Sequence, residues 1–343
     1  MTDIINKLYE KSEITESDLK KLISNDDFND YLIKKAVEVR KKHFGNKVYI
    51  RALIEISNIC KNDCYYCGIR KSNSVCDRYR LTKEEILECA QKGYELGFRT
   101  FVMQGGEDGF FTDSYMADVV SEIKKRYPDC AVTLSLGEKS FESYKMLFDA
   151  GADRYLLRHE TADEAHYGKL HPESMSFKKR MSCINSLKEI GYQTGIGFMV
   201  GSPFQTLDNI VKDLLFIKSI NPEMVGIGPF IPHKDTPFCG YSAGSADLTV
   251  KLISIIRLLL PKALIPSTTA LGSISEGGRE RGILAGANVI MPNLSPGNVR
   301  SKYSLYNNKL ATGLEAAEHL IELKEKIKSI GYEIVTDRGD YNG

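Results

Sequence analysis

The sequence predicts an α/β fold, a (β/α)8 barrel of the TIM type with an N-terminal helical extension. From residue 47 onward, short apolar runs rich in β-branched residues alternate with longer amphipathic stretches, as parallel strands do with crossover helices. Eight such runs occur, the number that closes a barrel. The chain has 343 residues, 42% of them hydrophobic, which is enough for one barrel. A doubly wound open sheet is the alternative.

The first 46 residues form a separate unit in the pattern. They are helical in pattern and rich in charged residues, with a helix start at Thr15 and a stop at Gly45. We expect a helical extension over 1–46, the barrel over 47–335 and a polar, loosely ordered tail over 336–343. The polar start lacks a signal-peptide pattern, and eight cysteines in such a chain suit a reducing compartment, so we expect a cytoplasmic protein.

Each apolar run after residue 46 is a candidate strand. The expected strands are Val48–Ile56, Thr100–Met103, Ala131–Leu136, Arg154–Arg158, Gln193–Met199, Met224–Ile227, Leu264–Thr269 and Asn288–Met291. The helices are expected to begin near Thr82, Ser114, Ser140, Phe177, Thr206, Ser245 and Gly277, with a last one over Gly313–Ile330. In such barrels the active site lies at the C-terminal ends of the strands, so unusual residues there are the candidates for function.

Charge and hydropathy exclude two classes of partner. With 46 basic and 45 acidic residues the net charge is +1, which gives no general electrostatic case for nucleic-acid binding. The most apolar helical stretch, Leu252–Leu260, is short and contains Arg257, so we expect no membrane span.

A loop with three cysteines follows the first expected strand. Cys60, Cys64 and Cys67 are spaced by three and then two residues, with Tyr66 before the last one. Thiolates are soft ligands that suit zinc or iron–sulfur clusters. A cubane cluster is usually held by four cysteines, so three would leave one iron open to an exogenous molecule. A zinc site or unrelated buried thiols remain the alternatives at this point.

Further candidates stand at the ends of the next strands. Gln104-Gly105-Gly106-Glu107 follows the second, where paired glycines let a ligand approach the backbone and a carboxylate can accept from an ammonium group. Thr133 and Ser135 alternate with leucines in the third, so both hydroxyls face one side. These features alone are also compatible with an ordinary turn and an ordinary strand.

The fourth strand carries an unusual density of charge, Arg154 to Thr161. Ionisable groups this close to a buried strand are costly unless paired, which leaves a structural salt-bridge cluster as one interpretation. The other is that Arg158 and Glu160 bind the two ends of an amino-acid-like ligand. Arg180, at the start of the next helix, could add a bidentate clamp for a carboxylate.

Together these motifs resemble the radical S-adenosylmethionine enzymes. Several blocks, including Cys60–Gly68, Ala152–Thr161 and Met224–Pro237, resemble the biotin synthase and methylornithine synthase branch, and within it the HydE-type FeFe-hydrogenase maturases. The resemblance implies one 4Fe–4S cluster on the three cysteines, which are the catalytic and metal-binding residues. Some members hold a second cluster on three cysteines near the C-terminus, but no cysteine follows Cys239 here, so we expect none.

The resemblance also implies roles for residues lining the cavity. The positions that match contacts to S-adenosylmethionine are Tyr66, Gln104, Gly105, Gly106, Glu107, Ser135, Arg158, Glu160, Arg180, Met199 and Ile231. Those that match the substrate cavity are Thr133, Arg154, Met224, Thr268, Thr269, Met291, Tyr303 and Tyr306.

The implied activity is reductive cleavage of S-adenosylmethionine to a 5′-deoxyadenosyl radical. In HydE-type enzymes this radical acts on a cysteine-derived iron synthon, and the product feeds the dithiomethylamine bridge of the hydrogenase H-cluster. The implied partners are a reductant such as ferredoxin or flavodoxin and other hydrogenase maturases. Two alternatives remain: a methylornithine-synthase-like enzyme acting on an amino acid such as lysine, and a carrier that holds a cluster or zinc without catalysis.

Overall fold

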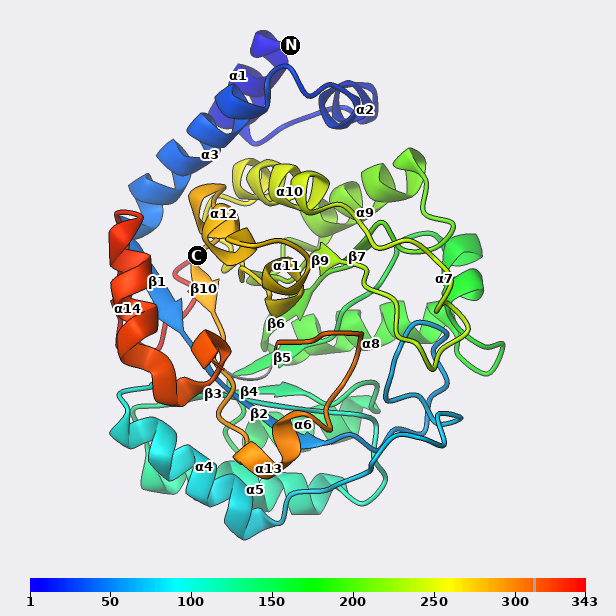
Figure 1. Cartoon of the computed structure of the whole chain (residues 1–343), viewed down its shortest axis with the longest axis vertical. Coiled ribbons are helices and arrows are strands. Elements are labelled where there is room, and N and C mark those ends of the chain that lie inside the picture. Colours follow the sequence, from blue (N-terminus) through cyan, green and yellow to red (C-terminus); the bar gives the residue numbers. More distant parts are fainter. Residues whose placement is uncertain (311–312) are drawn as a thin grey trace.

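The computed structural model describes residues 1–310 and 313–343, and it shows a parallel barrel surrounded by helices (Figure 1). The strands are β1 (Lys47–Ile50), β2 (Ala52–Ser57), β3 (Thr100–Gly105), β4 (Ala131–Ser135), β5 (Arg154–Leu156), β6 (Gln193–Ile196), β7 (Met199–Val200), β8 (Met224–Val225), β9 (Gly228–Pro229), β10 (Val289–Ile290) and β11 (Glu333–Val335).

The barrel closes through short pairings. The order β2-β3-β4-β5-β6-β8 is parallel throughout, and β10 pairs with β1, which continues into β2 after one residue. Parallel bridges from Met224 to Leu264 and from Pro266 to Val289 carry the pairing across the remaining gap. The seventh expected strand is therefore present as two bridging residues rather than a regular strand. The predicted (β/α)8 barrel is confirmed.

Helices cover the outside of the barrel. The N-terminal ones are α1 (Thr2–Lys11), α2 (Glu16–Ser24) and α3 (Asn29–Phe44). The barrel helices are α4 (Lys83–Glu95), α5 (Asp113–Arg126), α6 (Phe141–Asp149), α7 (Glu164–Leu170), α8 (Phe177–Ile190), α9 (Leu207–Ile220), α10 (Ala246–Leu259), α11 (Thr269–Ile274), α12 (Gly278–Leu284), α13 (Gly297–Arg300) and α14 (Leu320–Ser329). Short 3-10 turns, η1 (Gly313–Glu315) and η2 (Ala317–His319), replace the first part of the last expected helix.

Side-chain caps explain many of the helix starts. The Thr82 hydroxyl accepts from the backbone N–H of Glu85, and the Glu85 carboxylate accepts from the backbone N–H of Thr82, which makes a capping box at the start of α4. At the starts of α6, α8 and α10, the side chain of the N-cap serine accepts one backbone N–H of the first turn, without a reciprocal contact; these serines are Ser140, Ser176 and Ser245. The sequence did not predict α7, α11 and α13, which are short and lie within loops after strands.

Glycines within the expected strands allow neighbouring strands to approach each other closely. A Cβ at Gly197 would lie 1.9 Å from the carbonyl oxygen of Gly226. The fifth expected strand is divided into β6 and β7. The sixth is reduced to β8, and β9 follows it and pairs with β7. A strand interior with glycine marks such a close approach.

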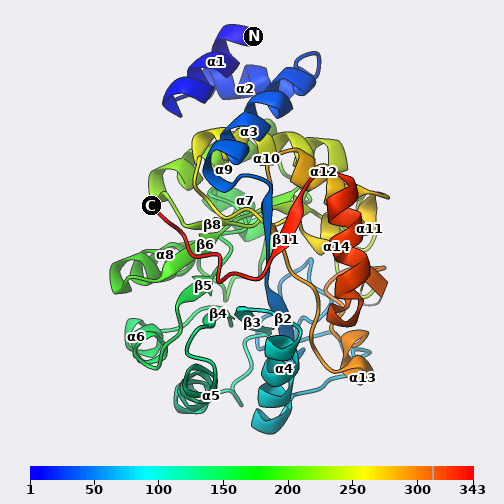
Figure 2. The same ribbon diagram turned by 90° about the vertical axis from the view of Figure 1, so that its left-hand side faces the viewer.

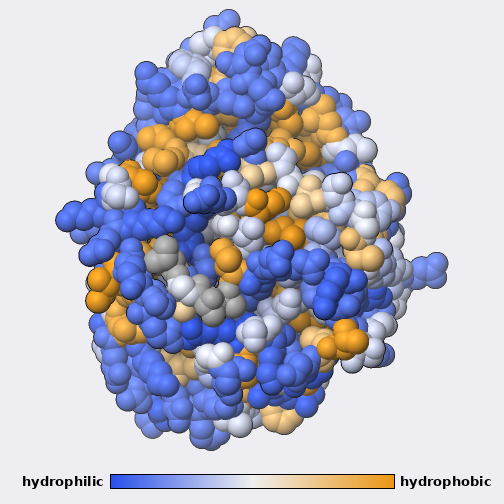
Figure 3. Space-filling model, in the orientation of Figure 1, coloured by the Kyte–Doolittle hydropathy of each residue, from blue (hydrophilic) through white to orange (hydrophobic). Residues whose placement is uncertain are grey.

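The N-terminal extension packs over one side of the barrel, where α3 lies against α10 (Figures 1 and 2). Arg40 is fully buried there, and its guanidinium donates to the backbone oxygens of Ala287, Gly45 and Lys47. Figure 3 shows a mostly hydrophilic surface on this face, with apolar residues near the junction of extension and barrel. No helix in the described part of the chain is long and apolar enough to cross a membrane.

The C-terminal tail differs from the expectation of a loose segment. After β11, which pairs with β1, residues 336–343 cross the N-terminal ends of the barrel strands (Figure 2). The backbone oxygen of Arg338 accepts from Thr100 Oγ1 at 2.8 Å, and the Tyr341 N–H donates to Gln193 Oε1 at 3.0 Å. Two polar side chains of the tail, those of Arg338 and Asp340, contact residues at the strand starts.

Candidate active site

The three-cysteine loop leaves β2 and is fixed by hydrogen bonds to its backbone. Asn58 donates to the oxygens of Asp77 and Lys302 at 2.8 and 2.7 Å. The guanidinium of Arg78 donates to the oxygens of Asn58, Ile69 and Arg70 within 2.8 Å. Two side chains thus determine the path of a loop that has no regular secondary structure.

The cysteine side chains are half-buried and close to soft or donating groups. The backbone N–H of Glu107 donates to Cys60 Sγ at 3.4 Å, and Met175 Sδ lies 3.6 Å from Cys64 Sγ. Burial raises the pKa of the Cys67 thiol to about 12. Burial also raises the pKa of the Cys60 and Cys64 thiols. Metal ions bind thiolates, so loading this loop releases protons and depends on pH.

The glycine pair after β3 packs directly against this loop. Gly106 N–H donates to Ser57 O at 3.1 Å, and a Cβ at Gly106 would lie 2.2 Å from Ile59 O and 2.8 Å from Cys60 Cβ. Only glycine fits without a shift of the backbone. This contact brings Glu107 beside the cysteine loop.

Glu107 belongs to a chain of charges that crosses from β3 to α8. Its carboxylate contacts Lys61 Nζ at 3.0 Å and accepts from the Glu138 N–H at 2.9 Å. Arg180 Nε donates to Glu138 Oε1 at 2.7 Å, and Arg180 Nη1 donates to Arg158 O at 2.6 Å. Glu138 was not predicted as a site residue, although it follows Gly137 in the loop after β4.

Arg158 and Glu160 meet beyond the end of β5. Their side chains form an ion pair at 3.0 Å, but this contact lacks hydrogen-bond geometry, so both retain capacity for a ligand. Glu160 has a φ of 64°, in the left-handed region that is strained for a non-glycine residue. Strain of this kind is concentrated at ligand sites. Among the described residues, Arg158 Nε and Nη2 and Glu160 Oε2 are not saturated by hydrogen bonds.

A small apolar cluster forms the adjoining wall. Met199 packs with Leu170, Phe230 and Phe238, and Tyr66 lies against them. The hydroxyl of Tyr66 is 3.1 Å from His171 Nε2, and burial lowers the pKa of His171 to about 3, so this imidazole is neutral at pH 7. Two other predicted residues lie at strand ends: Ser135 is the last residue of β4, and Ile231 follows β9.

The barrel interior contains a second group of predicted residues. Met224 and Met291 pack with Leu264 and Val289. Thr133 is buried, and its Oγ1 has no hydrogen-bond partner among the described residues, as is also true of Thr268 Oγ1. These hydroxyls are free to bind a ligand.

Arg51 is the charged residue of this interior that sequence analysis missed. Its side chain is 5% exposed, and Nη1 contacts Met224 Sδ at 2.9 Å. Nε and Nη2 have no hydrogen-bond partner in the part of the chain that is described. An arginine inside the apolar run Val48–Ile56 was a visible signal, because a buried cation requires an anion.

A segment after α13 covers the C-terminal side of the interior. Gln104 Nε2 donates to Tyr303 Oη at 3.3 Å. Lys309 forms an ion pair with Glu55 at 2.5 Å, and both are buried. Glu55 and Lys309 were also not predicted. Tyr306 lies in the same segment, close enough to Arg158 and Glu55 for their charges to act on its phenol.

Two predicted substrate residues already have protein partners. Thr269 Oγ1 donates to Glu315 Oε2 at 3.0 Å. Arg154 points to the N-terminal end of the barrel, where its Nη2 contacts Asp340 at 2.6 Å. We call Arg51, Thr133, Arg154 and Met224 the barrel floor. Arg154 belongs to it but is not aimed at the cysteine loop, because the tail holds its guanidinium.

The donor set fits a cubane iron–sulfur cluster with S-adenosylmethionine. Three soft thiols share one loop, a glycine leaves room beside Cys60, and Arg158 and Glu160 retain capacity for an amino-acid moiety. A model of the radical SAM superfamily matches residues 54–217. The chain belongs to this superfamily and is a radical SAM enzyme.

Relatives narrow the assignment further. The chain is 49% identical over 310 residues to the [FeFe] hydrogenase maturase subunit HydE of Thermotoga maritima, covering 90% of this chain and 88% of the relative. It is 30% identical over 288 residues to 3-methylornithine synthase of Methanosarcina acetivorans, covering 83% and 81%. The predicted HydE-type family is confirmed.

Solved structures agree with the fold. A methylornithine synthase crystal structure superimposes with a TM-score of 0.83 at 26% identity, covering 97% of both chains. The hydrogenase maturase HydG superimposes with a TM-score of 0.81 at 21% identity, covering 98% of this chain and 76% of that one. The second likeness supports the fold alone.

Proposed function

We propose that this protein acts in assembly of the FeFe-hydrogenase H-cluster, as a HydE-type maturase that supplies the dithiomethylamine bridge from a cysteine-derived iron synthon. The observation that carries the proposal is the 49% identity over 90% of the chain, together with the three-cysteine loop and the Gly105-Gly106-Glu107 turn of this sequence. When bound, the cluster and S-adenosylmethionine would supply a 5′-deoxyadenosyl radical.

Residues of this chain would bind and orient the cluster and S-adenosylmethionine. Cys60, Cys64 and Cys67 would hold the cluster, with one iron left for S-adenosylmethionine. Glu107 would accept from the methionyl ammonium group, exchanging its contact with Lys61. Arg158 would bind the methionyl carboxylate, because its Nε and Nη2 make no hydrogen bond to any described residue.

Further residues would hold the nucleoside and exclude water. Tyr66 and Met199 lie in one apolar cluster beside the cysteine loop, which suits the adenine and ribose. The segment with Tyr303 and Lys309 would cover the interior and keep water away from a reactive radical.

The interior supports a substrate with a negatively charged group. Arg51 presents two unused nitrogen atoms, and a buried cation of this kind is stabilised by an anion. Thr133 and Thr268 add hydroxyls on the same interior. A cysteine-derived carboxylate meets this requirement.

The remaining proposals concern cofactors and partners. We propose a single cluster, because no cysteine follows Cys239. We also propose a small reductant such as ferredoxin or flavodoxin as electron donor, and the other hydrogenase maturases as recipients of the product.

An in vitro hydrogenase maturation assay tests the proposal. Apo-hydrogenase mixed with the other maturases should become active when this protein is added, and should stay inactive with a Cys64→Ser variant. The matched control is Cys239→Ser, which removes an exposed thiol outside the motif. Full hydrogenase activity without this protein would reject the assignment.

The second candidate is a methylornithine-synthase-like reaction on lysine, favoured by the 30% identity and by the TM-score of 0.83. Incubation with lysine, S-adenosylmethionine and reductant, followed by product analysis, distinguishes the two. A carbon-skeleton isomer of lysine would support this candidate.

A further inference from the structure

The C-terminal tail forms the end wall of the barrel interior. Arg338 makes an ion pair with Asp153 at 2.9 Å, and its backbone oxygen accepts from Thr100 and Arg154, both at 2.8 Å. Asp340 accepts from Gln193 Nε2 at 3.2 Å. The tail is thus tied to the starts of β3, β5 and β6 (Figure 2).

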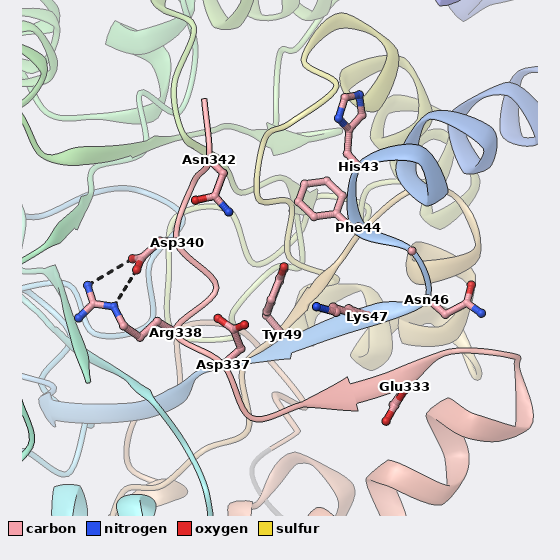
Figure 4. Close-up of a pocket in the computed structure, with 11 residues that line it drawn as sticks. His43, Phe44, Asn46, Lys47, Tyr49, Glu333, Asp337, Arg338, Asp340 and Asn342 are labelled. Carbon is pink, nitrogen blue, oxygen red and sulfur yellow. Dashed lines mark hydrogen bonds and ion pairs between the residues drawn. The ribbon is translucent and has the colours of Figure 1, made fainter. Parts of the chain in front are cut away.

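A surface pocket of about 740 Å³ lies on the outer side of this wall (Figure 4). His43, Lys47, Tyr49, Asp337 and Asp340 are among its lining residues. Asp340 therefore borders solvent, with 31% of its side chain exposed, while Arg154 on the inner side is fully buried. Asp340 thus lines the pocket and also contacts a buried arginine of the barrel.

Two buried arginines differ in how they are paired: Arg154 contacts the carboxylate of Asp340, and Arg51 does not. Arg154 contacts Asp340 at 2.6 Å, and its other nitrogens donate to Thr100 and Gln193. Arg51 has no carboxylate contact among the described residues and retains two unused nitrogens. Burial lowers the pKa of Arg51, the charge of Arg154 lowers it further, and Asp340 acts in the opposite direction.

We propose that Asp340 is a specificity-determining residue that sets the charge of the barrel floor. Asp340 pairs with Arg154 at 2.6 Å and also with Arg338 at 2.7 Å, and Arg338 is balanced in addition by Asp153 at 2.9 Å. Among the described residues this leaves the guanidinium of Arg51 without a carboxylate, so the floor accepts a singly charged group such as one carboxylate. Asp340 does not touch the substrate and acts through Arg154. The inference rests on the proposed function only in taking the barrel interior as the substrate chamber.

Anion binding to the reconstituted protein tests the inference. Formate is the probe, formamide its neutral analogue and sulfate a doubly charged competitor, each followed by the concentration dependence of thermal unfolding at constant ionic strength. The wild type should bind formate and not formamide. Asp340→Asn should lower the Kd for formate about fivefold and the Kd for sulfate more, because the floor then carries a second uncompensated charge.

A matched control and a charge-balanced variant separate this effect from damage to the tail. Asp337→Asn removes the same charge from the same segment, and its amide can still accept from the Gly339 N–H. It should leave the Kd for formate unchanged. The double variant Arg154→Gln/Asp340→Asn should return the Kd to near the wild-type value, because the floor again carries one charge.

Three results would overturn the inference. They are equal Kd values for Asp340→Asn and Asp337→Asn, no saturable formate binding by the wild type, or wild-type affinity in Arg154→Gln. The last variant removes the positive charge of Arg154 and keeps the negative charge of Asp340, so it should weaken formate binding about tenfold; it serves if Asp340→Asn does not fold. None of these measurements depends on hydrogenase activation, so failure of the proposed function is recognised separately.

Discussion

Gly106 is the position where the smallest change should have the largest effect on the site. In Gly106→Ala the new methyl group would lie 2.2 Å from Ile59 O and 2.8 Å from Cys60 Cβ. Backbone atoms cannot rotate away, so the two loops must separate by about 1 Å to restore ordinary contact distances. Overpacking of this kind costs about 1–3 kcal/mol, which for a chain of this size lowers the Tm by about 2–4 °C.

The functional loss should exceed the loss of stability. A shift at Gly106 moves Glu107, whose backbone N–H donates to Cys60 Sγ and whose carboxylate is the proposed acceptor for the methionyl ammonium group. We expect less iron and sulfide per protein after anaerobic reconstitution and at least about tenfold weaker S-adenosylmethionine binding, since misplacement by about 1 Å has effects of this size.

The matched control is Gly109→Ala, three residues further along the same loop. A Cβ at Gly109 would have no neighbour within 4 Å, so this variant should load its cluster and bind S-adenosylmethionine as the wild type does. Iron and sulfide analysis, equilibrium binding and thermal unfolding provide the three readouts. Wild-type cluster content and affinity in Gly106→Ala would refute the packing argument.

Three further predictions concern stability. Arg51→Met should raise the free energy of unfolding by about 1–3 kcal/mol, because it removes a buried cation whose contact is a single sulfur atom; a lower Tm would contradict this gain in stability. The same variant should abolish formate binding. Lys309→Met should lower the free energy of unfolding by about 3–5 kcal/mol, because it leaves the buried Glu55 carboxylate without its ion-pair partner. In urea titrations the double variant with Glu55→Gln should recover much of this stability, and additive losses from the two substitutions would exclude the coupling. His171 has a pKa near 6.5 in the unfolded chain and about 3 in the folded protein, so the free energy of unfolding should fall as the pH is lowered from 6.5 to 3. The decrease should be smaller in His171→Gln, and equal pH dependence of stability in the two proteins would contradict this prediction.

The sequence pattern was sufficient for the barrel and for the cysteine loop. Strand runs and caps such as Thr82 depend on local chemistry, so they are visible without the fold. The Gly105-Gly106-Glu107 turn lies next to the cysteine loop, because consecutive strand ends of a parallel sheet meet at one edge.

What could not be predicted depends on long-range contacts. The partner of Arg154 is Asp340, 186 residues away, so its direction could not be read from the strand on which it lies. The tail looked disordered because its polar residues find their partners only at the strand starts. Arg51 and Glu55 had a signal in the first strand, since charges within an apolar run are costly, but nothing local showed which of them would be paired.

The most direct test of the account is a count of 5′-deoxyadenosine and methionine released from S-adenosylmethionine by anaerobically reconstituted protein with dithionite. We expect both products in equal amounts from the wild type and from Cys239→Ser, and neither from Cys64→Ser. Cleavage by Cys64→Ser at the wild-type rate would contradict the claim that the three cysteines hold the reactive centre.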